Sequence, residues 1–239
     1  MSIRCSIPGT WLLERRGGDM VALSLASPIS LASGARRIGV RIERTLRPLK
    51  MKPSDQDLTI IGYRQSVEVR QDEDVPMTVV PWIIRQVAPR GLAFLTSSPP
   101  GSASRVFGEP PEAALMARDN LWLVDMSGPG FYKTAYHRNS IGLGRLGYLR
   151  ADKEGVACAL LYRPDQAAAR DYPEVLPHDA EAAGQAASLF YDSGRFGAYG
   201  ELELYGHRDS AGHGILTTDC LFLRGPVSRV REWIGLPPS

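Results

Sequence analysis

Two carboxylates placed two residues apart are the strongest candidates for chemistry in this sequence. Glu201 and Glu203 lie in AYGELELYGHRD (198–209), where polar and apolar residues alternate as they do in a β-strand. Side chains at positions i and i+2 of a strand point to the same face, so both glutamates share one face and Leu202 and Leu204 take the other. The acidic face is either a solvated surface or the lining of a site in which a glutamate acts as a general base.

A segment rich in rings and hydrogen-bond donors is a candidate partner for these glutamates. FYKTAYHRNSIGLGR (131–145) contains Tyr136, His137 and Arg138, a mixture that suits sugar binding in a concave site and suits an exposed loop equally well. Trp82, in VVPWIIR, is either a core residue or a ring on which a ligand packs.

The remaining motifs predict neither a metal nor a nucleotide. His207 and His213 flank a turn that contains Asp209, but their spacing matches no familiar zinc signature. GLGRLG (142–147) has the glycine spacing of a dinucleotide site, yet hairpin residues follow it where such a site needs a helix. We therefore expect no cofactor and no metal.

The pattern of the whole chain predicts a mainly β fold. Strand signals cover 20–44, 58–70, 87–96, 121–126, 146–164, 198–207 and 215–225. Short helices are predicted within 109–120, 178–190 and 226–235, and the last of these should bury Trp233. Glycines and prolines punctuate the chain without dividing it. We expect one antiparallel β-sandwich domain over residues 1–239, with few short helices.

Composition excludes several classes of protein. A net charge of +2 gives no electrostatic reason to expect a nucleic-acid partner. Three widely spaced cysteines without a Cys-x-x-Cys motif favour a reducing, cytoplasmic location. No apolar run approaches the ~20 residues of a membrane helix, and residues 20–33 alternate like a strand and not like a signal peptide.

Three motifs in the second half of the chain follow one another as in a known family. They are SIGLGRLGYLRADKEGVACALLYRPD, FYDSGRFGAYGELELYGH and TTDCLFLRGPVSRVREWIGL. Their order resembles that of uncharacterised relatives of aldose 1-epimerase, and the N-terminal hairpin 20–49 is similar as well. The resemblance implies a galactose mutarotase-like supersandwich with a carbohydrate-sized groove on one sheet. It also implies that an N-terminal portion is missing, because the chain is shorter than a full supersandwich.

The resemblance also implies roles for individual residues. The catalytic base of the family is a glutamate in a late strand, and Glu203 in ELELY is the best match, with Glu201 as the fallback. The family's catalytic histidines have no counterpart at matching positions. From the residues themselves, His137 or His207 is the candidate acid, and Arg138, Tyr136, His207 and Trp82 are the candidate substrate-binding residues.

The predicted function is acid–base interconversion of sugar anomers, with a small-molecule carbohydrate as the partner. Two alternatives stay open: a carbohydrate-binding module without catalysis, and a β-sandwich assembly protein without a ligand. A sugar-binding titration separates the last from the other two, and a mutarotation assay separates the first two. The sequence specifies neither the sugar nor the oligomeric state.

Overall fold

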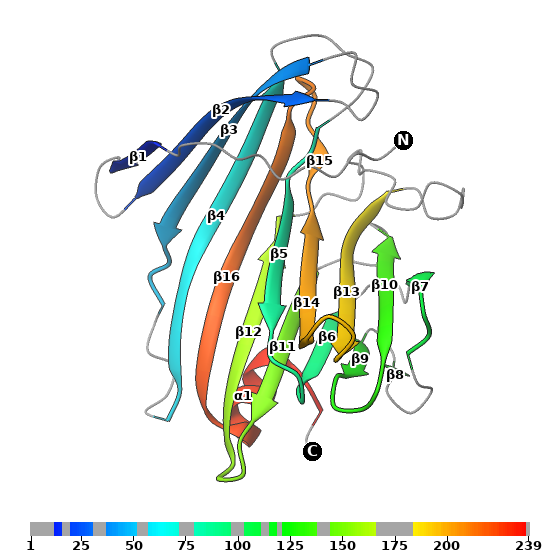
Figure 1. Cartoon of the computed structure of the whole chain (residues 1–239). Helices are drawn as coiled ribbons and strands as arrows, with labels where there is room; N and C mark the ends of the chain where they lie inside the picture. Colours follow the sequence, from blue (N-terminus) through cyan, green and yellow to red (C-terminus); the bar gives the residue numbers. More distant parts are fainter. Residues whose placement is uncertain are drawn as a thin grey trace.

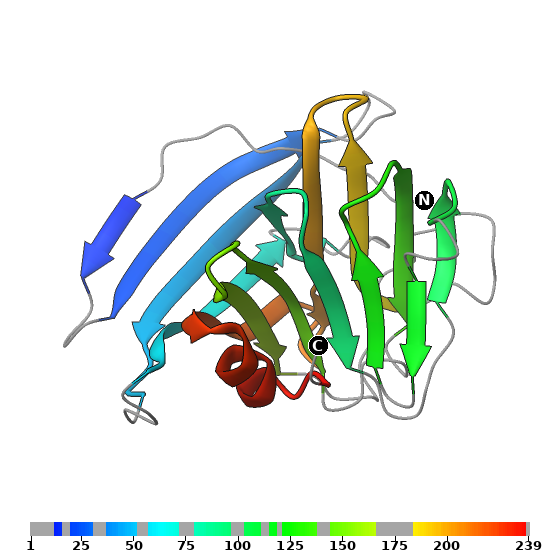
Figure 2. The same cartoon turned by 90° about the horizontal axis from the view of Figure 1, so that it is seen from below.

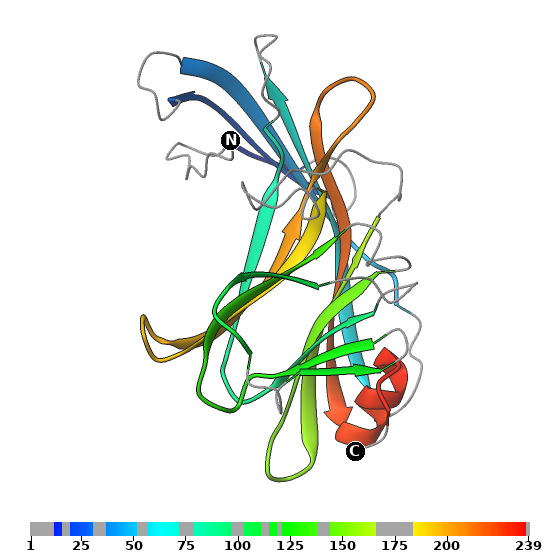
Figure 3. The ribbon, with the colours of Figure 1, turned by 90° about the vertical axis from the view of Figure 1, so that its right-hand side faces the viewer.

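The described strands form two antiparallel sheets that stack face to face, which confirms the predicted β-sandwich (Figures 1 and 3). The structure is a computed structural model, and it describes residues 12–15, 20–30, 37–51, 57–71, 79–96, 103–110, 115–118, 121–137, 144–165 and 184–237. Neither sheet closes into a barrel.

The larger sheet has eleven strands, and most of its neighbours pair in long registers. Ten strands follow one another across it and β15 (His207–Arg208) pairs beside β16. In spatial order the ten are β1 (Leu12–Arg15), β2 (Val21–Ser30), β3 (Arg37–Pro48), β4 (Thr59–Gln71), β16 (Gly214–Pro226), β12 (Val156–Pro164), β11 (Arg145–Ala151), β6 (Leu92–Thr96), β9 (Leu121–Asp125) and β8 (Leu115–Arg118).

The smaller sheet has five strands and carries the residues that the sequence marked for chemistry. Its spatial order is β5 (Trp82–Val87), β14 (Ala198–Tyr205), β13 (Gln185–Ser193), β10 (Phe131–His137) and β7 (Ala103–Phe107). In Figure 1 these strands lie in front of one half of the larger sheet, while β1, β2 and β3 extend beyond them.

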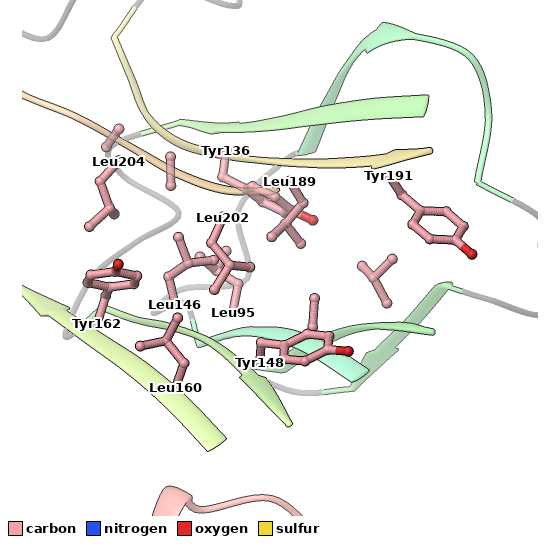
Figure 4. Close-up of a cluster of buried hydrophobic side chains, with 14 of the residues drawn as sticks. Leu95, Tyr136, Leu146, Tyr148, Leu160, Tyr162, Leu189, Tyr191, Leu202 and Leu204 are labelled. Carbon is pink, nitrogen blue, oxygen red and sulfur yellow. The ribbon is translucent and has the colours of Figure 1, made fainter. Parts of the chain in front are cut away.

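Alternation along the strands builds the core between the sheets. In Figure 4, Leu202 and Leu204 of β14 and Tyr136 of β10 point toward Leu146 and Tyr162 of the larger sheet. Burying a leucine-sized side chain contributes roughly 1.5–3 kcal/mol to the free energy of folding. This apolar layer is therefore the main interaction that holds the two sheets together. The alternate residues of the smaller sheet consequently face away from the core.

A second apolar layer lies on the other face of the larger sheet, where α1 (Val227–Ile234) packs against β12 and β16 (Figure 2). The helix was predicted from its apolar spacing, and the prediction is confirmed. Gly235 ends it at a positive φ of 75°, and its N–H and that of Leu236 close the last turn on Glu232 and Arg231 carbonyls.

The burial predicted for Trp233 is only partly right. Val230 and Ile234 are the fully buried residues of α1, whereas Trp233 is half-buried at the rim of that layer. Its ring lies under the Arg163 guanidinium, whose carbon is 5.0 Å from the ring centroid. The helix is therefore anchored by its aliphatic stripe more than by its tryptophan.

Two of the three predicted helices are wrong where the structure describes them. Residues 115–118 of the range 109–120 form β8, paired with β9, and residues 185–190 of the range 178–190 begin β13. Residues 111–114, 119–120 and 178–183 of these two predictions lie outside the described residues. The alanine-rich composition before β13 favours a helix locally, but β13 is the central strand of its sheet and pairs on both sides. Tertiary pairing overrides a weak local propensity of this kind.

The hairpin β11–β12 forms as predicted, and its turn explains why. The Asp152 carboxylate accepts hydrogen bonds from the backbone N–H groups of Glu154 and Val156, both at 2.9 Å. Gly155 adopts a φ of +79°, which a residue with a side chain adopts at a cost. The turn chemistry thereby sets the register of the two strands.

Gly147→Ala should destabilise the protein. A Cβ at this position in β11 would lie 2.2 Å from the Phe94 ring and 2.7 Å from the Leu160 carbonyl oxygen, and Phe94 is fully buried. Overpacking of this kind typically costs about 1–3 kcal/mol. Urea unfolding should show the loss, while Gly128→Ala, with open space around its Cβ, should stay within about 0.5 kcal/mol of wild type. Equal midpoints for the two variants would contradict the packing described here.

No helix within the described ranges is long and apolar enough to span a membrane.

Candidate functional site

The two predicted carboxylates do lie on one face of β14, as the alternation required. Leu202 and Leu204 are buried between the sheets, so Glu201 and Glu203 lie on the opposite side, here called the outer face of the smaller sheet. Their surroundings differ: Glu203 is 1% exposed, whereas Glu201 is half-buried. The two positions are therefore not equivalent chemically.

Glu203 is the acceptor at the centre of a buried polar cluster. Trp82 Nε1 and the Tyr205 hydroxyl both donate to its Oε2 at 2.8 Å. Lys133 Nζ lies 2.7 Å from both carboxylate oxygens. The Ser188 hydroxyl is 2.9 Å from that of Tyr205. We call these five residues the Glu203 cluster.

The sheet register brings Lys133 to Glu203 from two strands away. Ser188 of β13 pairs with Glu203 on one side and with Ala135 of β10 on the other, and Lys133 is two residues from Ala135 on the same face. The long lysine side chain must therefore cross β13 to reach the carboxylate. Lys133 is itself 4% exposed, and its Nζ is 5.4 Å from the centroid of the Trp82 ring.

A buried ion pair of this kind is costly to build. Removing two charges from water costs several kcal/mol per ion, which a single Coulomb contact repays only with good geometry and further hydrogen bonds. The Trp82 and Tyr205 donors supply those hydrogen bonds here. Buried charged pairs with several fixed donors occur often at functional sites, which makes this cluster the leading candidate.

Glu201 contacts β5 at a different residue from Glu203. Gln86 of β5 lies opposite it in register, and Gln86 Nε2 donates to Glu201 Oε1 at 3.2 Å. On the other side Glu201 pairs with Phe190 of β13. The outer face thus combines a half-exposed carboxylate and amide with the buried Glu203 cluster.

Aromatic side chains continue the outer face beyond Lys133. Phe190 and Phe107 are its register partners on either side, and Phe131 lies two residues before it. The rings pack edge to face and stacked, with centroids 5.2–6.0 Å apart. We call this set the aromatic patch: Phe107, Phe131, Phe190, Phe196 and Tyr199.

Part of the aromatic patch is open to solvent. Phe196 is 72% exposed and Phe107 is 37% exposed. The Arg195 guanidinium lies over Phe131, 4.7 Å from the ring centroid. Exposed apolar surface adjoining polar groups is typical of ligand or partner binding sites.

Asp192 shapes the turn that carries Phe196. Its carboxylate accepts hydrogen bonds from the backbone N–H groups of Gly194, Arg195 and Phe196, at 2.6–2.8 Å. Burial opposes ionisation, but these three donors and the Arg195 charge outweigh it and lower the pKa of Asp192.

Asp192→Asn should lower the melting temperature at neutral pH, and the deficit should shrink in acid. Because the folded state has the lower pKa, the ionised carboxylate contributes its full stability above the unfolded pKa of about 4. That contribution is lost as pH falls through the folded pKa. Thermal unfolding at several pH values between 7 and 2 measures the difference. A deficit that stays constant over this range would show that the charge of Asp192 is not involved.

The structure brings together only part of the predicted site. Trp82 contacts Glu203 directly. Tyr136 faces the inter-sheet core, on the opposite side of β10 from Lys133, and is fully buried there (Figure 4). His137 ends β10 beyond a register shift. His207 is buried in β15, which pairs with the larger sheet. Arg138 lies outside the described residues.

Tyr205 and Ser188 belong to the cluster but were not predicted for it, and Lys133 was expected only as one of several donors in the segment 131–145, without a role of its own. A signal existed for Lys133, because FYKTAYH places a lone charge in an otherwise apolar strand, where a charge needs a partner. Tyr205 could have been found as the next residue on the face of Glu203. Ser188 was hidden by the prediction of a helix.

No group of three or more metal-ligating side chains assembles within the described part of the chain. His213 Nδ1 is 3.6 Å from Glu68 and 3.7 Å from Asp209, so its neighbours are carboxylates.

Comparison with known proteins yields no relative. No protein-family model, no curated protein and no solved structure matches the chain. The resemblance to aldose 1-epimerases therefore stays a prediction, and function has to be argued from the geometry.

Proposed function

We propose that the outer face of the smaller sheet is a carbohydrate site with Glu203 and Lys133 as its acid–base pair. The supporting observation is the 2.7 Å contact between a carboxylate and an ammonium group that are both buried. Opening a cyclic sugar requires a base for the anomeric hydroxyl and an acid for the ring oxygen. One ion pair carries both functions.

The reaction balances without any other reactant. Glu203 takes the proton of the anomeric hydroxyl, Lys133 gives a proton to the ring oxygen, and the bond between the anomeric carbon and the ring oxygen breaks. The open aldehyde and a neutral acid–amine pair result. Rotation about the bond to the aldehyde carbon and the reverse proton transfers close the ring as the other anomer. Lys133 thus replaces His137 and His207 as the proposed acid, and the Tyr205 hydroxyl holds the carboxylate in place.

The other groups of the outer face suit recognition of a polyol. Glu201 and Gln86 offer an acceptor and a donor with some exposure, and the rings of the aromatic patch offer apolar surface beside them. Binding sites for small molecules commonly combine apolar walls with a few directional polar groups.

Binding without turnover is the second candidate, and a specific observation favours it. Glu203 is 1% exposed, so a sugar reaches its carboxylate only after the side chains around it move. Phe196 and Phe107, by contrast, are accessible as the structure stands. A carbohydrate-binding module would need no more than these rings and the Glu201–Gln86 pair.

Saturation-transfer difference NMR with a panel of aldoses tests sugar binding itself. We expect signal transfer to at least one sugar, reduced by Tyr199→Ala and by Gln86→Leu on the outer face. Ile61→Ala, an exposed residue of the larger sheet, is the matched control and should leave the transfer unchanged. Absence of transfer to every sugar, or loss of transfer only in the control, would reject both candidates.

A further inference from the structure

A second polar cluster lies on the inner face of the larger sheet, which is the face toward the smaller sheet. Arg44 of β3 donates from Nη2 to Gln65 Oε1 of β4 at 2.8 Å. Tyr63 precedes Gln65 by two residues and shares its face. Arg85 of β5 donates to the Tyr63 hydroxyl at 3.3 Å. We call these four residues the arginine cluster.

Strand register fixes the place of this cluster. Tyr63, Cys220 and Tyr162 are successive partners across β4, β16 and β12, and the last two are buried in the core between the sheets. Arg44 pairs with Val67, which lies on the same face as Tyr63. In Figure 1, β5 passes in front of β12 beside β16, and Arg85 of β5 reaches the Tyr162 and Tyr63 hydroxyls of the larger sheet.

Both arginines meet neutral partners. Arg85 Nε donates to the Tyr162 hydroxyl at 3.1 Å, and Cys220 lies between Tyr63 and Tyr162 as the register partner of both. Both guanidiniums act electrostatically on Tyr63 and Cys220. No carboxylate of the described chain forms an ion pair with Arg44 or Arg85.

Two donors in the cluster are buried and unused. Gln65 is 2% exposed, and its Nε2 has no hydrogen-bond partner among the residues that the structure describes. Within the same ranges, Arg44 Nε is also buried and lacks a partner. Because buried donors cost free energy when they are left unsatisfied, two adjacent ones beside unpaired positive charge indicate a missing acceptor.

We propose that the arginine cluster binds a small organic carboxylate. A carboxylate only accepts hydrogen bonds, so its two oxygens suit Arg44 Nε and Gln65 Nε2, and its charge balances the arginines. Val67 beside Arg44, and the Tyr63 and Phe222 rings with centroids 6.3 Å apart, are apolar neighbours for an organic body. Inorganic phosphate has no organic body to contact these apolar neighbours. It also has more charged oxygens than Arg44 Nε and Gln65 Nε2 can bind.

Isothermal titration calorimetry of the full chain tests the proposal with benzoate, octanoate and inorganic phosphate as probes. We expect saturable binding of at least one carboxylate and weaker binding of phosphate. Arg44→Met and Gln65→Leu should each weaken carboxylate binding about ten-fold or more, because each removes a charged or buried hydrogen bond. Arg64→Met is the matched control, since Arg64 lies between Tyr63 and Gln65 on the other face of β4 and pairs with Asp219.

Gln65→Glu is a second test, which does not depend on how well the other variants fold. The new carboxylate would sit beside Arg44 and take the place of the ligand's charge, so the variant should melt at a higher temperature and no longer bind carboxylates. Three results would each overturn the proposal. The wild-type protein could bind none of the carboxylates, it could bind phosphate more tightly than any carboxylate, or the Gln65→Glu variant could bind carboxylates as tightly as wild type does. Arg44→Met should leave sugar transfer at the outer face unchanged, so this proposal and the carbohydrate site fail independently.

Discussion

Lys133→Met is expected to cost about 3–5 kcal/mol of unfolding free energy, the range measured when one partner of a buried ion pair is removed. Methionine preserves most of the apolar stem that crosses β13, so the loss reports the ammonium group. Without it, the Glu203 carboxylate stays buried with only the Trp82 and Tyr205 donors. Urea unfolding monitored by circular dichroism measures the change.

The exposed pair Arg64–Asp219 is a matched control on the larger sheet. Its 2.6 Å contact is as short as the buried one, but the Arg64 side chain is 56% exposed. Arg64→Met should therefore cost no more than about 1 kcal/mol. Adding Glu203→Gln to Lys133→Met should recover part of the loss, because it removes the stranded charge. A Lys133→Met loss equal to that of the control would contradict the burial of the pair.

Much of the architecture was predictable because it depends on local patterns. The ELEL alternation assigned the two faces of β14, the ADKEG turn identified the β11–β12 hairpin, and apolar spacing located α1. Each of these signals comes from neighbouring residues. The alanine-rich composition of 178–190 misled for the same reason, since only the pairing with β10 and β14 makes its described residues, from Gln185 onward, a strand.

The composition of the site was harder to predict because it depends on pairing between distant strands. Lys133 and Glu203 are 70 residues apart in the sequence. They also lie on strands that are not neighbours, because β13 lies between β10 and β14 in the sheet. The assignment of Tyr136 failed for a simpler reason. Positions 133 and 136 differ by an odd number, so a strand places them on opposite faces. Recognising 131–137 as a strand would have selected Lys133 instead.

Glu203→Gln should reduce any anomer interconversion by about 10²–10⁴-fold, the usual contribution of a positioned acid–base group. Glutamine keeps the size of the side chain and an acceptor for Trp82 and Tyr205, but it cannot take the proton. The variant should also be less stable than wild type, because the Lys133 ammonium loses its carboxylate partner. Rates should therefore be compared well below its melting temperature.

Glu201→Gln is the matched control for this variant, since it makes the same substitution two residues away on the same face. Its partner is Gln86 and not Lys133, so we expect a much smaller change in rate. Sugar binding should persist in both variants. If Glu201→Gln and Glu203→Gln lowered the rate of anomer interconversion equally, the effect would come from the overall charge of the outer face and not from Glu203 itself.

Exchange NMR of aldose anomers in weakly buffered solution measures whether Glu203 and Lys133 catalyse anomer interconversion. It compares the rate of α–β interconversion with and without the wild-type protein, for each sugar that shows saturation transfer. If Glu203 and Lys133 act as an acid–base pair, the rate should exceed that of buffer, rise in proportion to protein concentration and be lost in Glu203→Gln. A wild-type rate equal to that of buffer with every such sugar would contradict the acid–base role of Glu203 and Lys133.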